Sequence, residues 1–244
     1  GFNVGINIDS SKIIYNEINC YVKELIESFK RYDTYTYIRF MKRTIEKFNL
    51  EKGSKEAYLE FRDYYNSLPI NKRDPRLLLV LILYSYNQQI RFNNSHEFNN
   101  PAGIRWFNDK ILEKLVSFSR KIKEKNVKLI CSDYSDFLNN HEIDTESFIY
   151  VDPPYMLTNG SYNDGKRGFK GWTLELEEEL FNYLDILTKD KIKFLLSYVY
   201  EHKGKINTNL AEWIDKNDYI VVELGDVIGI SGSQRKEILI KNYE

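Results

Sequence analysis

The stretch Phe148-Ile149-Tyr150-Val151-Asp152-Pro153-Pro154-Tyr155 decides the fold class of this 244-residue sequence. Its four apolar or aromatic residues predict a buried strand, which the two prolines end. Parallel-sheet enzymes carry functional groups at the carboxyl ends of strands, where loops open onto a crevice. A carboxylate beside a fixed backbone carbonyl offers two acceptors to an amino group, and the tyrosine ring offers a flat surface to a planar base. A plainer interpretation, a strand-ending turn with a surface tyrosine, stays open on these residues alone.

Strands and helices alternate on either side of this turn. Short apolar runs predict further strands at 12–15, 127–131, 194–198, 220–224 and 238–241. Helical spacing predicts helices at 173–187 and 210–214. The alternation indicates an α/β fold with a mainly parallel sheet, whose last two strands are close enough along the chain to pair antiparallel.

Residues 20–125 follow a helical pattern instead. Apolar residues at helical spacing predict helices around 21–29, 38–48 and 58–65, a buried helix at 77–86 and a polar helix at 109–125. Residues 87–107 interrupt this pattern because they are rich in Asn and contain a Pro101-Ala102-Gly103 break. They predict a hairpin or an ordered loop.

The charge of the chain divides along the same line. The net charge is −1, from 35 Lys and Arg against 36 Asp and Glu. Residues 20–130 hold 22 basic against 13 acidic residues, a net of +9, and the remaining residues carry a net of −10. A basic part joined to an acidic part predicts two functions on two surfaces.

Composition excludes several other classes of protein. Mean hydropathy is −0.51 and the longest apolar run, 77–83, is far shorter than a membrane span, so no membrane association is expected. No secretory signal is recognised. Cys20 and Cys131 form no disulfide framework and no metal-ligand spacing, and three scattered histidines predict no zinc site, so a reducing cytoplasm is the expected location. Apolar residues at 42% and aromatic residues at 15% argue against disorder.

Four stretches together resemble the Dam-like DNA N6-adenine methyltransferases, which use S-adenosylmethionine. The turn at 152–155 is similar to their catalytic motif, and residues 14–19 are similar to their second-strand segment. Residues 86–103 resemble their DNA-recognition hairpin, and residues 231–236 resemble their C-terminal loop. The four occur in the family's order and span nearly the whole chain.

The resemblance implies a Rossmann-like α/β sheet with an inserted helical DNA-recognition domain. The catalytic, cofactor-binding domain would comprise 1–19 and 126–244, and the recognition domain 20–125, with its hairpin at about 86–107. The family's first strand and most of its Gly-rich loop are missing from 1–19, and Gly1 matches the end of that loop. We therefore expect further residues before Gly1.

The resemblance also implies the cofactor-binding residues. Glu17 would bind the ribose hydroxyls of S-adenosylmethionine, as acidic residues after the second strand do in nucleotide-binding folds. Asp133 and Tyr134 would flank its adenine, and Gly1 and Asp152 would complete the cofactor site. Taken without this context, Glu17 is better explained as a solvated carboxylate at a helix start.

In the implied reaction the methyl group goes to N6 of an adenine that has left the DNA stack. Asp152 and the carbonyl of Pro153 would accept hydrogen bonds from the amino group, Pro154 would stiffen the turn, and Tyr155 would stack on the base. No metal is expected to take part.

Double-stranded DNA is the implied partner. Tyr86 matches a position that enters the duplex beside the flipped base, and the other implied contacts come from Asn87, Gln89, Arg91, Asn93, Pro101, Arg105, Arg235 and Lys236. Arginine and asparagine are suited to hydrogen-bond guanine and adenine edges, respectively. Two alternatives to base recognition stay open: Arg91 contacts only phosphate, and Tyr86 only packs within the protein. Gln88-Gln89 departs from members that recognise GATC, so this target is not predicted.

Three rival functions stay open at this point: N4-cytosine methylation, methylation of RNA or a protein amide, and DNA binding by a relative without a cofactor site. The favoured hypothesis is a monomeric adenine-specific enzyme in the cytoplasm of a bacterium, or encoded by a phage. A restriction endonuclease could accompany it.

Overall fold

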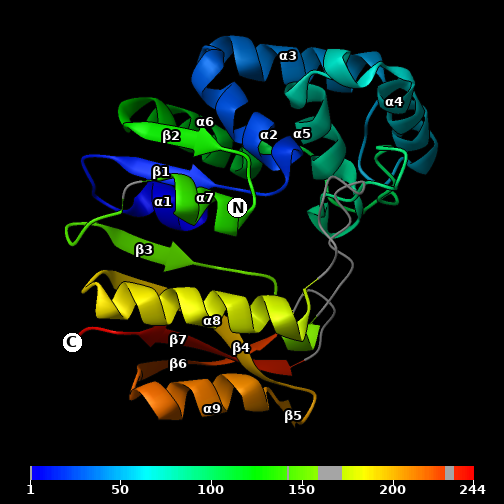
Figure 1. Cartoon of the computed structure of the whole chain (residues 1–244). Coiled ribbons are helices and arrows are strands. Elements are labelled where there is room, and N and C mark those ends of the chain that lie inside the picture. Colours follow the sequence, from blue (N-terminus) through cyan, green and yellow to red (C-terminus); the bar gives the residue numbers. More distant parts are fainter. Residues whose placement is uncertain (1, 142, 159–171, 229–233) are drawn as a thin grey trace. The chain divides into compact units, whose positions relative to one another are not determined.

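The computed structural model describes residues 2–141, 143–158, 172–228 and 234–244, which form two compact units (Figure 1). The first unit comprises the described residues up to Asn140. The second comprises those from His141 onward. Each unit has its own sheet and its own helices.

The first unit is mainly helical around a pair of parallel strands. Strand β1 (Ile13–Asn16) pairs with β2 (Val127–Ile130) in a register that places Asn16 opposite Ile130. The helices are α1 (Asn3–Asn7), α2 (Cys20–Arg31), α3 (Thr34–Lys47), α4 (Lys55–Ser67), α5 (Pro75–Tyr84), α6 (Asp109–Glu124) and α7 (Tyr134–Asn140), with short 3₁₀ turns at Ile70–Lys72 and Tyr86–Gln88.

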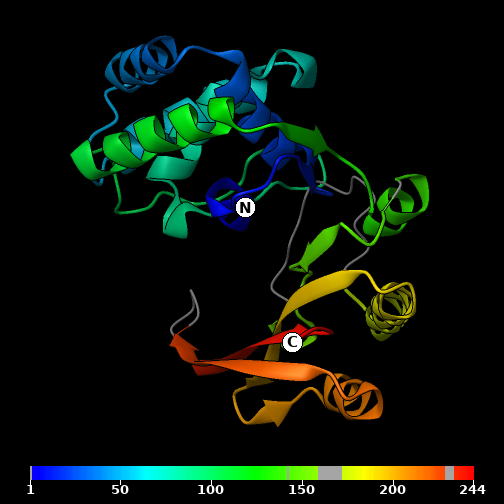
Figure 2. The same ribbon diagram turned by 90° about the vertical axis from the view of Figure 1, so that its left-hand side faces the viewer.

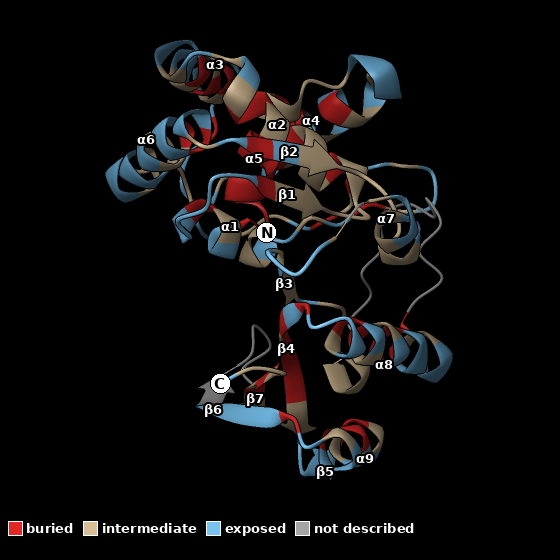
Figure 3. Ribbon diagram, turned by 60° about the vertical axis from the view of Figure 1, so that its left-hand side comes forward, coloured by how far each residue is buried: buried red, intermediate tan, exposed pale blue. Residues whose placement is uncertain are grey.

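Local sequence accounts for where these helices begin. The side chains of Asn19, Asp33 and Asn108 accept hydrogen bonds from backbone N–H groups in the first turns of α2, α3 and α6. Asp74 does the same for α5, which has Pro75 at its first position. These groups satisfy amides that a helix start leaves without partners. Helix α5 is buried from Leu77 to Tyr84, as its apolar sequence predicts (Figure 3).

The second unit contains a five-stranded mixed sheet. Its path is β3 (Phe148–Val151), β4 (Lys193–His202), β7 (Gln234–Lys241) and β6 (Ile220–Ile228), and β5 (Lys205–Ile206) pairs with the end of β4. Strand β3 is parallel to β4, whereas β7 is antiparallel to both β4 and β6. The antiparallel pairing of the last two strands is confirmed. The prediction of a mainly parallel sheet is correct only for the pairs β1–β2 and β3–β4. Strand β7 runs antiparallel to its neighbours, because the short connection after β6 reverses the chain.

Helices α8 (Leu174–Lys189) and α9 (Thr208–Asn217) lie on one face of this sheet (Figure 2). They contact each other through Phe181 and Trp213, whose rings stack with centroids 4.3 Å apart. Phe194, Leu196 and Tyr198 of β4 are fully buried. Since parallel β3 ends beside the middle of β4, this core lies next to the Asp-Pro-Pro-Tyr turn.

Candidate active site and nucleic-acid interface

The turn after β3 brings a carboxylate and a phenol together. The Tyr155 hydroxyl donates a hydrogen bond to Oδ1 of Asp152 at 2.7 Å. Asp152 is exposed while Tyr155 is partly buried, and burial together with the adjacent carboxylate raises the pKa of the phenol. The phenol therefore stays a donor at neutral pH, and Asp152 retains acceptor capacity for a second partner.

Arg235 and Lys236 lie in strand β7 rather than in a loop. The Arg235 guanidinium is 5.8 Å from the Tyr155 ring centroid and forms an ion pair with Glu237. Lys236 forms an ion pair with Glu223 at 2.6 Å. The preceding residues 231–233, which carry part of the family resemblance, lie outside the described residues.

Two acidic side chains follow the parallel strands of the first unit. Glu17 accepts hydrogen bonds from the Tyr15 hydroxyl at 2.9 Å and from the backbone N–H of Asn19 at 3.1 Å. Asp133 accepts from the backbone N–H and the hydroxyl of Ser135. The carboxyl ends of neighbouring parallel strands share one edge, so the two carboxylates occupy the same edge of this sheet.

This edge fits a ligand that carries hydroxyl groups. Glu17 is half-buried and oriented by two donors, and each carboxylate oxygen retains a lone pair for a ribose hydroxyl. Tyr134 begins α7 directly after Asp133. Gly1 lies outside the described residues. The cofactor roles of all four residues remain predictions.

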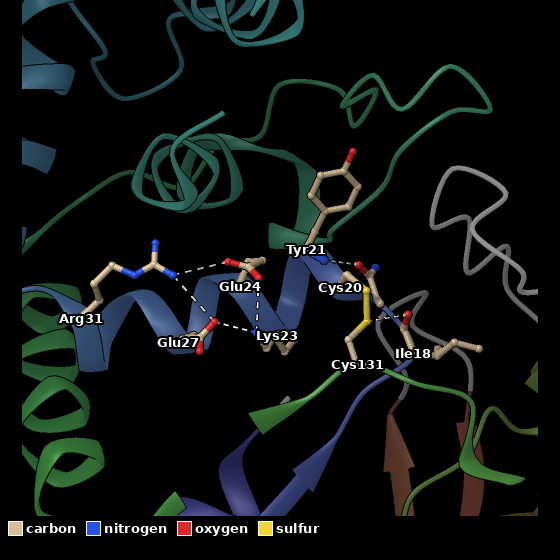
Figure 4. Close-up of polar contacts among 9 residues, drawn as sticks. Ile18, Cys20, Tyr21, Lys23, Glu24, Glu27, Arg31 and Cys131 are labelled. Atoms are coloured by element: carbon tan, nitrogen blue, oxygen red, sulfur yellow. Dashed lines mark hydrogen bonds and ion pairs between the residues drawn. A yellow bond between two sulfur atoms is a disulfide. The ribbon is translucent and has the colours of Figure 1, made fainter. Parts of the chain in front are cut away.

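The same edge carries a disulfide between Cys20 and Cys131, whose Cα atoms are 5.4 Å apart (Figure 4). The sequence-based expectation that the two cysteines form no framework is wrong. They are 111 residues apart in sequence, and only the pairing of β1 with β2 brings them together. The argument from cysteine content for a reducing location therefore no longer holds.

The segment at about 86–107, predicted to be a hairpin or an ordered loop, is an ordered, irregular loop rather than a regular β-hairpin. Isolated bridges join Ser85 to Ala102 and Phe92 to Phe98, and between them the chain leaves regular pairing. Asn87 and Gln88 have φ angles of 52° and 55°, in the left-handed region that Asn tolerates better than most residues. The backbone thus turns sharply directly after Tyr86.

The predicted DNA-contacting residues of this loop divide into two groups. One group is exposed and consists of Tyr86, Gln89, Arg91, Pro101 and Arg105. Asn93 belongs to the other group, because its side chain accepts from the N–H groups of Ser95 and Glu97 and donates to the Glu97 carboxylate. Asn93 therefore shapes the loop tip, and Asn87 is only half-buried in the turn.

No helix in the described part of the chain is long and apolar enough to cross a membrane. Among these same residues, no three His, Cys, Asp or Glu side chains cluster so that they could hold a metal ion.

Comparison with known proteins places this sequence in a family. The D12 class N6 adenine-specific DNA methyltransferases match residues 1–225. The chain belongs to this family. The Asp-Pro-Pro-Tyr turn, the strand-end carboxylates and the loop at 86–103 all lie within the matched range.

Individual relatives of this family are similar over nearly the whole chain. The type II methyltransferase M.FokI of Planomicrobium okeanokoites is 40% identical over the entire chain, and the modification methylase StsI of Streptococcus sanguinis is 37% identical. The chain spans 38% of the length of each of these two proteins. The DNA adenine methylase of Escherichia coli K12 is 29% identical, over 97% of this chain and 80% of that protein.

Four polar residues that support these sites were not found by sequence reasoning. Asn16 bonds to the backbone and hydroxyl of Ser132 and ties the ends of β1 and β2 together. The others, Asn100, Glu177 and Tyr198, are buried and hydrogen-bonded. Their partners lie 11 to 116 residues away, so no local pattern marks them.

Proposed function

We propose that the protein methylates N6 of adenines in duplex DNA with S-adenosylmethionine as the methyl donor. The observation that carries this proposal is the turn after β3, where an exposed Asp152 is oriented by Tyr155 within a chain of the adenine-specific family. The proposal covers the activity of the whole protein, since M.FokI and StsI, each of which the chain spans to 38%, are much longer than this chain.

The turn can hold an amino group by its two hydrogens. Asp152 would accept one hydrogen bond and the Pro153 carbonyl the other, which leaves lone-pair density on the nitrogen directed away from both acceptors. Tyr155 would support the base face, and its bond to Asp152 would keep the carboxylate in one orientation. Bound S-adenosylmethionine supplies an electrophilic methyl group, and alignment is the contribution of the protein.

Glu17 would bind the ribose of the cofactor, supported by the donors from Tyr15 and Asn19. Asp133 and Tyr134 would contact the cofactor adenine. A direct test is calorimetric binding of S-adenosylmethionine to the Glu17→Gln variant. Weaker binding with unchanged DNA affinity is expected, and unchanged cofactor binding would contradict the assignment.

The loop at 86–107 would read the duplex. Its exposed members would contact bases and phosphates, while the Lys and Arg residues of 20–130 would neutralise phosphates. Binding should weaken steeply with salt, because each neutralised phosphate releases counterions. A flat dependence of DNA affinity on salt concentration would contradict this role.

Methyl transfer itself is tested with full-length protein, labelled S-adenosylmethionine and plasmid DNA, followed by sequencing of modified bases. We expect N6-methyladenine at one short sequence, and loss of transfer in Asp152→Ala with most nonspecific DNA binding retained. N4-methylcytosine would select the rival reaction, and no transfer to DNA would overturn the proposal.

The two longer relatives carry names of type II or modification enzymes, which supports a restriction-modification setting. We place the protein in the bacterial cytoplasm, acting as a monomer beside a restriction endonuclease. Plasmid DNA from cells that express the protein should then resist cleavage by that endonuclease, whereas DNA from cells expressing Asp152→Ala should be cut.

A further inference from the structure

The second unit contains a fully buried carboxylate that the proposed chemistry does not use. Glu177 of α8 has no exposed surface, and no Lys or Arg forms an ion pair with it in the described parts of the unit. Its oxygens instead accept from the Tyr198 hydroxyl at 2.6 Å and from the amides of Asn207 and Asn209, each at 2.8 Å. A buried carboxylate without hydrogen-bond donors would strongly destabilise the fold. The three donors therefore hold Glu177 in one orientation.

The Tyr198 hydroxyl uses its full hydrogen-bonding capacity. The indole Nε1 of Trp172 donates to it at 2.9 Å and the backbone N–H of Met156 at 3.4 Å. An indole and an amide can only donate, so the single hydroxyl hydrogen must point to Glu177. Glu177 therefore fixes the direction in which this hydroxyl presents its lone pairs.

Tyr198 contacts the Asp-Pro-Pro-Tyr turn at two points. The last residue of β3, Val151, lies opposite Leu196 of β4, and Tyr198 lies two residues beyond on the same face, where the turn passes. Its hydroxyl accepts from the residue directly after Tyr155. Its ring meets the Tyr155 ring edge-on, with centroids 5.4 Å apart and planes at 68°.

We infer that Tyr198, oriented by Glu177, is a positioning residue for methyl transfer that sets the plane of the Tyr155 ring and, through it, the orientation of Asp152. This inference rests on the proposed function. It adds a residue that would act through its contacts with Tyr155 and Met156.

The same unit supplies a matched control. Tyr219 also has a buried ring, and its hydroxyl also bonds to a carboxylate, Asp185, at 2.8 Å, and to the Thr188 hydroxyl at 3.0 Å. None of its described contacts involves residues 152–156. Tyr219→Phe therefore makes the same chemical change at a comparable site away from the turn.

The first experiment measures kcat, KM for DNA and Tm for full-length Tyr198→Phe and Tyr219→Phe. We expect both to lower Tm similarly, but only Tyr198→Phe to lower kcat, by about 10- to 100-fold, since small misplacements of a catalytic group have effects of this size. KM for DNA should change less than threefold. Equal kcat values in the two variants would overturn the inference.

The second experiment combines each variant with Tyr155→Ala and compares single-turnover rates. If Tyr198 acts through the Tyr155 ring, Tyr198→Phe has little further effect once that ring is gone. The same fold loss with and without Tyr155 would overturn the inference. If Tyr198→Phe does not fold, Trp172→Phe removes another bond to the same hydroxyl and should lower kcat likewise.

Wild-type activity separates the two levels of failure. If the wild type methylates DNA and Tyr198→Phe has the same kcat as the wild type, only the positioning role is rejected. A wild-type protein that methylates no DNA rejects the proposed function and the inference that rests on it.

Discussion

Asn100 in the first unit and Glu177 in the second are both buried polar side chains beside a segment with a proposed function, but their hydrogen bonds run in opposite directions. The Asn100 amide nitrogen lies 2.8–3.0 Å from Ser85 Oγ and the carbonyls of Tyr86 and Gln89, so it donates directly to the start of the loop at 86–107. The Glu177 side chain only accepts, and it is linked through Tyr198 to the residue after the Asp-Pro-Pro-Tyr turn. Asn100 therefore constrains the backbone of its loop, whereas Glu177 constrains the orientation of side chains at the turn.

The two units differ further in covalent linkage. The disulfide belongs to the first unit, and its cysteines join the start of α2 to the end of β2. The turn of the second unit depends on hydrogen bonds and ring contacts instead. The following predictions test this contrast in order of expected effect.

Reduction should produce the largest difference between the units. A loop of this length loses about 4–5 kcal/mol of stabilisation when its cross-link is removed, in the chain-entropy account. We expect Cys20→Ser/Cys131→Ser to lower the free energy of unfolding of the first unit by this amount and leave the second nearly unchanged. Hydrogen exchange in urea, read by peptide, measures both units. Dithiothreitol should have no added effect on the variant, and equal losses in both units would contradict the contrast.

Asn100→Asp should have the next largest effect. The change replaces the donor with an oxygen that faces three acceptors, at a cost of about 3 kcal/mol or more for unsatisfied buried groups. We expect a lower Tm and a higher KM for DNA with little change in kcat. Asn100→Ala, which removes the donor without adding repulsion, should be milder. A fall in kcat at constant KM would contradict a role confined to the recognition loop.

Glu177→Gln is the reciprocal change and should cost less, about 1–2 kcal/mol. Asn209 can rotate its amide to present an oxygen to the new NH2 group, and the remaining oxygen can still accept from Tyr198. Asn207 cannot rotate without loss, because its Oδ1 accepts from the N–H of Leu210 at the start of α9. Thermal unfolding of the two isosteric variants side by side measures the difference. A greater loss in Glu177→Gln than in Asn100→Asp would reverse the comparison.

Alkaline pH should affect one buried tyrosine of each unit alike. Burial raises the pKa of Tyr58 in the first unit and of Tyr198 in the second above the ordinary value of 10.0. Above pH 10 the unfolded chain therefore loses protons that the folded protein retains. Stability is fully present below that pH and falls above it, by about 1.4 kcal/mol per pH unit for each such tyrosine. Tyr58→Phe and Tyr198→Phe should each reduce this slope equally in denaturant titrations between pH 9 and 11. Unequal changes in slope would show that the two sites do not titrate alike.

Much of the secondary structure was predictable because its signals are local. The helix at 109–125 and the helix after Thr173 are confirmed within two residues, since apolar spacing and capping side chains define them. Helices α1 and α7 were not predicted. They are only five and seven residues long, too short for periodicity to indicate them.

By itself, the sequence determined the Asp-Pro-Pro-Tyr turn, the basic segment around the loop at 86–107 and the family, because each depends on residues that are neighbours along the chain. Tertiary structure alone decided that Cys20 meets Cys131 and that Glu177 accepts the hydrogen of the Tyr198 hydroxyl. A hydrogen bond or a disulfide requires atoms a few ångströms apart. Partners separated by tens of residues reach that distance only when strands pair and helices pack.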